Sequence, residues 1–145
     1  MDISNLTTST NEQEGKWFQV ELYGKKQPFA LKILGNESDE VIFYQREQLK
    51  KLKEIGKEAE EMTDDEFTEL LDAGEEAIIT RIVGISSVRQ KGKFNSEFEL
   101  INEAVILDGK ELKNDKTSYK TLVEKIPAIK DFILKKSRDR SNFLD

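Results

Sequence analysis

The chain has 145 residues, of which 29 are acidic and 23 basic, so its formal net charge is −6. This length suits one domain of ordinary size, and the acidic balance argues against a general binder of the nucleic-acid backbone, which needs a basic surface. Cysteine and histidine are both absent, which excludes disulfides, thiol nucleophiles, zinc–thiolate sites and the commonest general base.

The first segment, residues 1–15, is rich in Ser, Thr, Asn and Glu and shows no apolar periodicity, so we expect a flexible tail. It lacks the basic-then-apolar form of a signal peptide, and no apolar run of the chain reaches the length of about 18 residues that a membrane span needs. We therefore expect a soluble protein of the cytoplasm, with residues 16–145 forming a single α+β domain.

Two short segments after the tail have the pattern of strands. Residues 17–22 and 29–33 each alternate apolar and polar side chains, which is the period of a half-buried strand. Residues 24–28 contain a glycine and a proline and predict the turn between them. The sequence therefore predicts an N-terminal β-hairpin.

A long helix is predicted next. Ser38 is the expected N-cap, and acidic residues follow it in the first turn. Apolar residues then recur at spacings of three and four from Val41 to Met62, which predicts an amphipathic helix of about 20 residues with one narrow stripe. Gly56 lies inside this pattern and costs about 1 kcal/mol relative to alanine, so we expect the helix to bend or loosen there.

A second helix is predicted from a capping box formed by Thr63 and Glu66. Gly74 either ends this helix or lies within it, because the β-branched residues at 75–85 suit a helix and a strand equally well. Short strands are expected over 86–114, where Asp108 and Gly109 form a hairpin signal.

The C-terminal part predicts two short helices. Asn114 or Asp115 caps the first, and Pro127 suits the first turn of the second. Together these elements predict an α+β fold in which an N-terminal β-hairpin precedes a mainly helical domain with a small central β element.

Two large apolar residues lie almost at the end of the chain. Phe143 and Leu144 each follow an apolar residue of the last helix, Phe132 and Ile133, by eleven positions. Eleven residues bring a helix back to within about 20° of its starting direction. If the last helix continues, these residues extend its apolar stripe and anchor the end of the chain.

No constellation of residues predicts catalysis, a metal site or a cofactor. The acidic clusters at 37–40 and 63–66 lie at helix starts, where capping explains them. The basic run at 135–140 is interrupted by an acid, and Asp131 is placed to pair with Lys135, so nucleic-acid binding is not expected. The chain has no phosphate-binding glycine loop, and its Ser pair at 86–87 has no histidine to activate it. Aromatic residues at 17, 18 and 23 suit packing better than a recognition patch.

The C-terminal pattern resembles that of a known family. A Gly-Lys turn at 109–110, a capped helix, a helix begun by Pro127 and a closing Arg-to-Leu segment with Asn-Phe-Leu at 142–144 are similar to the end of the tail assembly chaperones of long-tailed bacteriophages. The opening of a long charged helix at 35–40, after a β-hairpin, resembles their N-terminal half.

The resemblance implies a non-catalytic chaperone in the host cytoplasm. Such proteins coat the helical tape-measure protein before the tail tube polymerises, so the tape-measure protein and the tail tube protein are the implied partners; self-association is left open. The alternatives are a structural virion component, such as a head–tail adaptor or minor tail protein, and an acidic inhibitor of a host factor. The charges interleave too evenly along the chain to favour the inhibitor.

An apolar groove is what a binder of amphipathic helices presents. The sequence indicates five residues that form either such a partner-binding surface or this chain's own core, without separating the two uses: Ile129, Phe132, Ile133, Phe143 and Leu144.

Overall fold

A four-stranded antiparallel sheet and five α-helices make up the computed structural model, which describes residues 1–56, 59–91 and 97–144. The strands of the sheet lie in the order β1-β2-β3-β4, and a separate two-stranded hairpin joins β5 to β6. The strands are β1 (Lys16–Leu22), β2 (Lys25–Ile33), β3 (Ile82–Gln90), β4 (Phe98–Ile101), β5 (Val105–Leu107) and β6 (Lys110–Leu112).

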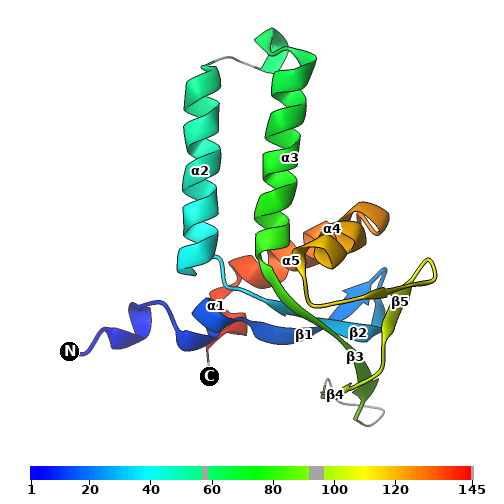
Figure 1. Cartoon of the computed structure of the whole chain (residues 1–145). Helices are drawn as coiled ribbons and strands as arrows, with labels where there is room; N and C mark the ends of the chain where they lie inside the picture. The colour runs from blue at the N-terminus through cyan, green and yellow to red at the C-terminus, as the bar shows by residue number, and fades with distance from the viewer. Residues whose placement is uncertain (57–58, 92–96, 145) are drawn as a thin grey trace.

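The helices divide into a docked N-terminal turn, a long pair and a C-terminal pair (Figure 1). They are α1 (Thr10–Glu14), α2 (Asp39–Ile55), α3 (Asp64–Thr80), α4 (Lys116–Lys125) and α5 (Ile129–Arg138), with short 3-10 turns at Ser4–Leu6, Ala59–Glu61 and Arg140–Asn142.

The predicted N-terminal β-hairpin is confirmed, with a tighter turn than expected. Tyr23 and Gly24 both have positive φ, 54° and 73°, as a two-residue turn matched to the twist of the strands requires. The following residues belong to β2 rather than to the turn. Pro28 is accommodated in β2 because the pairing with β1 shifts register opposite it, between Gln19 and Glu21, so its missing N–H breaks no regular ladder.

The core lies between the sheet and the C-terminal helices, which cover one of its faces (Figure 1). The alternation in β1 and β2 directs one set of side chains toward α4 and α5, as period two requires. Buried residues of the sheet and of these helices form one cluster: Val20, Leu31, Ile33, Ile82, Ile85, Tyr119, Leu122, Val123, Ile129 and Ile133. The predicted α+β class is confirmed, and the sheet is larger than expected because β3 pairs with β2.

Local signals place the helix ends. The side chains of Ser38, Thr63 and Asp115 each accept the expected capping hydrogen bond. The expected bend at Gly56 is wrong, because this residue ends α2 in the left-handed conformation, with φ 58°, and donates its N–H to the carbonyl of Leu52. Helix α3 continues through the glycine at 74 and ends at residue 80, and the β-branched residues that follow form β3.

The N-terminal segment differs from the expected flexible tail. Residues 9–15 form a capped helical turn that docks on the start of the loop after β2, where the N–H of Gly35 donates to the carbonyl of Glu12 at 2.9 Å. The side chain of Glu12 is fully buried. The sequence carries the signal for this turn, a capping box between Ser9 and Glu12. The described side chains of residues 1–7 are exposed, and flexibility of these residues stays a prediction.

Candidate partner-binding surface

Three of the five residues expected at a partner surface or core lie on α5 and pack within or against the core of this chain. Ile129 and Ile133 project from α5 into the cluster between helix and sheet and are fully buried, and Phe132 packs against the edge of that cluster. These positions follow the i, i+3, i+4 pattern that faces one side of a helix. Contact of any of them with a partner stays a prediction.

The two terminal residues have different environments. The last helix does not continue to the end of the chain, because α5 ends at Arg138 and Asp139 adopts an extended conformation, so Phe143 and Leu144 do not extend its stripe. A 3-10 turn then brings Phe143 back to the sheet, where it is 1% exposed and meets the ring of Phe18 edge-on, with 5.6 Å between centroids. Leu144 is 47% exposed. Phe143 is therefore a core residue, and Leu144 is not.

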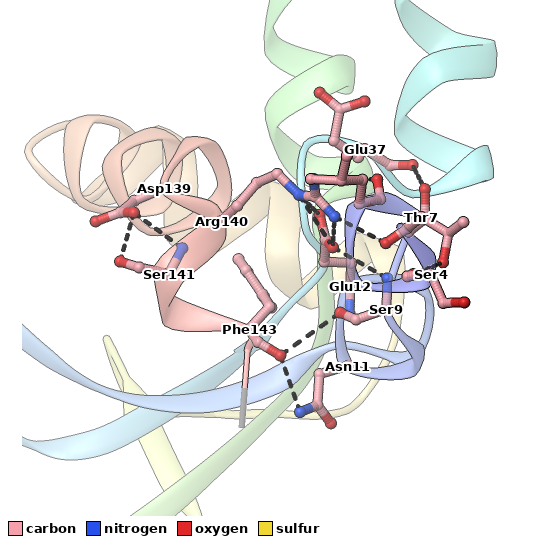
Figure 2. A network of polar contacts seen from close by, with 12 residues as sticks. Ser4, Thr7, Ser9, Asn11, Glu12, Glu37, Asp139, Arg140, Ser141 and Phe143 are labelled. Atoms are coloured by element: carbon pink, nitrogen blue, oxygen red, sulfur yellow. Dashed lines mark hydrogen bonds and ion pairs between the residues drawn. The ribbon is translucent and has the colours of Figure 1, made fainter. Parts of the chain in front are cut away.

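A polar network joins the two terminal segments beside Phe143 (Figure 2). The guanidinium of Arg140 donates to Glu12, with Nη2 2.9 Å from Oε1 and Nε 3.1 Å from Oε2, and also to the carbonyl of Thr7 at 2.9 Å. The carbonyl of Phe143 accepts a hydrogen bond from the Asn11 amide at 3.1 Å. Such a bidentate, charge-assisted pair fixes geometry well, so this network ties the N-terminal helical turn to the C-terminus.

The ionisation of Glu12 is set by this network. Burial raises the pKa of its carboxyl, but the hydrogen bonds from Arg140 and Ser9 and the positive charge of Arg140 together outweigh burial, so the pKa lies below its ordinary value. The same pair raises the pKa of Arg140. Glu12 therefore remains a carboxylate in the folded protein at neutral pH.

The basic run at 135–140 makes its contacts within this chain. The predicted pair forms, with Lys135 Nζ 3.0 Å from the carboxylate of Asp131. The ammonium of Lys136 lies over the rings of Phe18 and Phe132, at 5.6 and 5.8 Å from their centroids. Together with the engagement of Arg140 by Glu12, these contacts place three of the four basic side chains of the run against groups of this chain.

Several exposed apolar residues lie on α2 and α3, which stand away from the sheet as a helical hairpin (Figure 1). Both helices are inserted between β2 and β3, which are neighbours in the sheet. Seventeen residues of helix span about 25 Å. Between Ile42 and Glu76, none of the residues whose burial is described is buried, so most of the hairpin lies outside the core.

A shallow apolar groove runs between the two helices of the hairpin. It has a volume of about 470 Å³ and is lined by four residues of α2 and by two residues of α3 that are three positions apart. Leu49 and Leu52, 63% and 46% exposed, also line an adjoining depression whose other walls are basic. The groove lining comprises Gln45, Gln48, Leu49, Leu52, Leu70 and Ala73, and the basic rim of the adjoining depression comprises Arg46, Lys50 and Lys53.

A buried arginine fastens the base of the hairpin to the rest of the fold. Arg81 follows α3 and is 3% exposed. Its guanidinium donates to the carbonyl of Ala77 at 2.7 Å, to Asn36 Oδ1 at 2.8 Å and to the Ser137 hydroxyl at 3.1 Å. Burial, together with the nearby charge of Arg138, lowers the pKa of Arg81 to about 10, so it is charged at neutral pH. The hydrogen bonds link the end of α3 and the loop before α2 to α5.

The two helices of the hairpin differ in charge. Helix α3 contains seven acidic residues and no basic one: Asp64, Asp65, Glu66, Glu69, Asp72, Glu75 and Glu76. Helix α2 carries four basic side chains within residues 46–53 and one acid there. The even interleaving of charge expected from the whole chain therefore does not hold for the hairpin.

The acidic clusters, the Ser pair at 86–87 and the early aromatic residues form no common site among the described residues. Among the described residues, no group of three or more Asp or Glu side chains could hold a metal ion. The Ser87 hydroxyl is 2.7 Å from the carbonyls of Ile101 and Glu103 and so joins β3 to the segment after β4. Of the early aromatic residues, Trp17 lies close to Gly84 and Tyr23 is 88% exposed at the hairpin turn, so they form no common patch.

No described helix is long and apolar enough to cross a membrane.

The arrangement on the hairpin suits binding of another helix, because two helices with an apolar groove between them leave room for a third in the same bundle. The sequence predicted both helices and the apolar stripe of the first, but it did not single out this groove. The i, i+3 pairs Leu49–Leu52 and Leu70–Ala73 were its only local signal.

Comparisons with family models, with curated proteins and with solved structures found no match.

Proposed function

We propose that the chain is a non-catalytic tail assembly chaperone that binds helical segments of a tape-measure protein in the groove between α2 and α3. The observation that carries this proposal is the open apolar groove on a hairpin with no described buried residue from Ile42 to Glu76. A client helix would lay its apolar stripe against Leu49, Leu52 and Leu70, in the helix-in-groove mode of recognition.

The rigid base of the hairpin supports the same use. A groove that presents a client helix in a fixed direction loses less conformational entropy on binding than a mobile one. The hydrogen bonds of Arg81 to Asn36 and Ser137 join the end of α3 and the loop before α2 to α5. The absence of cysteine and histidine from the chain also favours a binding role over catalysis.

The test is co-purification of the full chain with the tape-measure protein encoded by the same genome. The double variant Leu49→Ser/Leu52→Ser removes the α2 side of the groove. Its matched control, Leu100→Ser/Ile106→Ser, changes two residues of similar exposure, 46% and 58%, that lie on β4 and β5. We expect the first variant to lose the complex and the control to retain it. Equal recovery with both variants would remove the groove from the proposal.

Mass spectrometry of purified particles distinguishes the proposed chaperone from the alternative, a structural virion component. A chaperone leaves the tail before it is complete, whereas an adaptor or minor tail protein remains. Detection of the chain in mature particles at a fixed copy number would therefore favour the component.

The acidic surface of α3 favours one second candidate, an inhibitor that occupies the basic site of a host nucleic-acid-binding protein. Seven carboxylates on one helix provide the concentrated negative charge that such mimicry requires. The basic residues of α2 lie beside this helix and reduce the field, as in the pair between Lys51 and Glu69 at 3.8 Å. Recovery of a host nucleic-acid-binding protein that is released by Asp65→Lys/Asp72→Lys, and not by the Leu49→Ser/Leu52→Ser variant, would support it.

A further inference from the structure

Both helices of the hairpin leave large apolar side chains uncovered. On α2, Leu49 and Leu52 are 63% and 46% exposed, and on α3, Phe67 and Leu71 are 46% and 60% exposed. Exposed apolar residues grouped in this way generally mark a surface that another molecule covers. Any occupant must match the apolar stripes and the charges beside them.

The charges beside the stripes indicate which occupant fits. The stripe of α2 is bordered by Arg46, Lys50 and Lys53, so a helix that covers it should carry carboxylates beside its own apolar residues. Helix α3 has this composition, since Phe67 and Leu71 lie among seven acids with no basic residue. We propose that two copies of the chain pair through their hairpins, with α2 of each copy packed against α3 of the other.

The symmetry of the pair follows from the same charges. Two hairpins can face each other about a two-fold axis that runs either parallel to their helices or across them. An axis across the helices would place α2 against α2 and α3 against α3, which brings cations to cations and carboxylates to carboxylates. A parallel axis places α2 against α3 at both contacts and avoids this repulsion. The two sheets of the dimer then lie at the same end of a four-helix bundle.

The parallel axis also predicts which residues meet. A rotation about this axis leaves the height of every residue along the hairpin unchanged. Lys51 and Glu69 lie at one height, because their side chains are 3.8 Å apart across the hairpin. The two helices are antiparallel. Residue 49, two positions before Lys51, and residue 71, two positions after Glu69, therefore also lie at one height. Leu49 of one copy should therefore lie at the height of Leu71 of the other.

The absence of native cysteine makes this geometry directly testable by cross-linking. Full-length Leu49→Cys protein is mixed with full-length Leu71→Cys protein that carries a mass tag, and the mixture is oxidised at low protein concentration. The expected product is the mixed disulfide dimer, which should exceed both like-with-like dimers. Like-with-like dimers as the main products would overturn the parallel two-fold axis.

A second measurement keeps the proposal testable if the cysteine variants fold poorly. By light scattering, the unmodified chain should have about twice its monomer mass of 16.7 kDa, and the variant Arg46→Glu/Lys50→Glu/Lys53→Glu should lose the dimer and return to the monomer mass. The control Lys110→Glu/Lys113→Glu/Lys120→Glu changes the net charge equally at exposed lysines outside the hairpin and should remain dimeric. A monomeric unmodified chain, or equal dimer loss in both variants, would overturn the pairing.

The second copy and the proposed tape-measure helix compete for one surface, and only this competition rests on the proposed function. A tape-measure fragment should convert the cross-linkable dimer into a complex with one copy of the chain. If the dimer forms as expected but does not bind the fragment, the proposed function is contradicted and the pairing is unaffected. If the chain is always monomeric but binds the fragment, the pairing is contradicted and the proposed function is supported.

Discussion

Arg140 donates hydrogen bonds to both carboxylate oxygens of Glu12, although the two residues are 128 positions apart in the sequence. Glu12 is fully buried, and its carboxylate also accepts the N–H of Ser9 at 3.0 Å, which completes the capping box of α1. The Glu12 side chain therefore takes part in both a local cap and a long-range ion pair. The contact lies beside Phe143, whose carbonyl accepts a hydrogen bond from Asn11 of the same N-terminal segment.

Replacing Glu12 by glutamine should destabilise the fold. The amide keeps the shape of the side chain but removes its charge, so the hydrogen bonds from Arg140 weaken and one donor is misplaced. Charge-assisted hydrogen bonds of this kind correspond to a fall in melting temperature of about 3–10 °C for a chain of this size. The control is Glu14→Gln, on the same short helix but exposed, which should leave the melting temperature nearly unchanged. Equal melting temperatures for the two variants would contradict a stabilising ion pair.

The same carboxyl should make stability depend on pH in the acid range. The folded protein holds the pKa of Glu12 below its ordinary value, so the contribution is fully present above the unfolded-state pKa, about 4.3, and is lost as the pH falls through the folded-state pKa. Denaturant unfolding at a series of pH values measures this. The stability difference between the unmodified chain and Glu12→Gln should be constant above about pH 5.5 and shrink below about pH 4. A difference that does not change with pH would show that Glu12 titrates normally.

The two terminal apolar residues should respond differently to truncation. Phe143→Ala removes a ring that is 1% exposed and should lower the free energy of unfolding by about 3–5 kcal/mol. Leu144→Ala changes a residue that is 47% exposed and should lower it by less than about 0.5 kcal/mol. Chemical denaturation of both single variants separates the effects. A large loss with Leu144→Ala would mean that the terminus packs on this chain more closely than the structure shows.

Glycine at position 35 should be required for the N-terminal segment to dock. A Cβ at Gly35 would lie 2.7 Å from both Cβ and Cγ of Glu12, which is closer than such atoms approach. Limited proteolysis of the unmodified chain should trim residues 1–7 and spare 9–15, whereas Gly35→Ala should expose the whole segment. The control is Gly74→Ala, whose Cβ would have only an ordinary contact at 3.8 Å and which should stabilise α3 by about 0.5–1 kcal/mol. Protection of residues 9–15 in Gly35→Ala would contradict this account.

Local signals in the sequence were sufficient for the starts of three helices and for one turn. The caps at Ser38 and Thr63 and the turn at 108–109 were predicted where the structure has them, and Asp115 was one of two candidates for the third cap. Each depends on a hydrogen bond or a φ value within about four residues, so its energy is set by neighbours in the sequence. The capping box at Ser9 belongs to this class as well, but a polar composition concealed it.

The sequence by itself therefore predicted helices α2 to α5, the first hairpin and the apolar stripes of the first long helix and the last helix. Only the tertiary structure decided which stripes are covered. Phe143 and Leu49 are equally apolar in type, yet one closes the core beside Phe18 and the other lies exposed on the hairpin. A stripe records that burial is favourable but not which surface provides it, because its partner is distant in the chain and is brought near only by folding or by a second molecule.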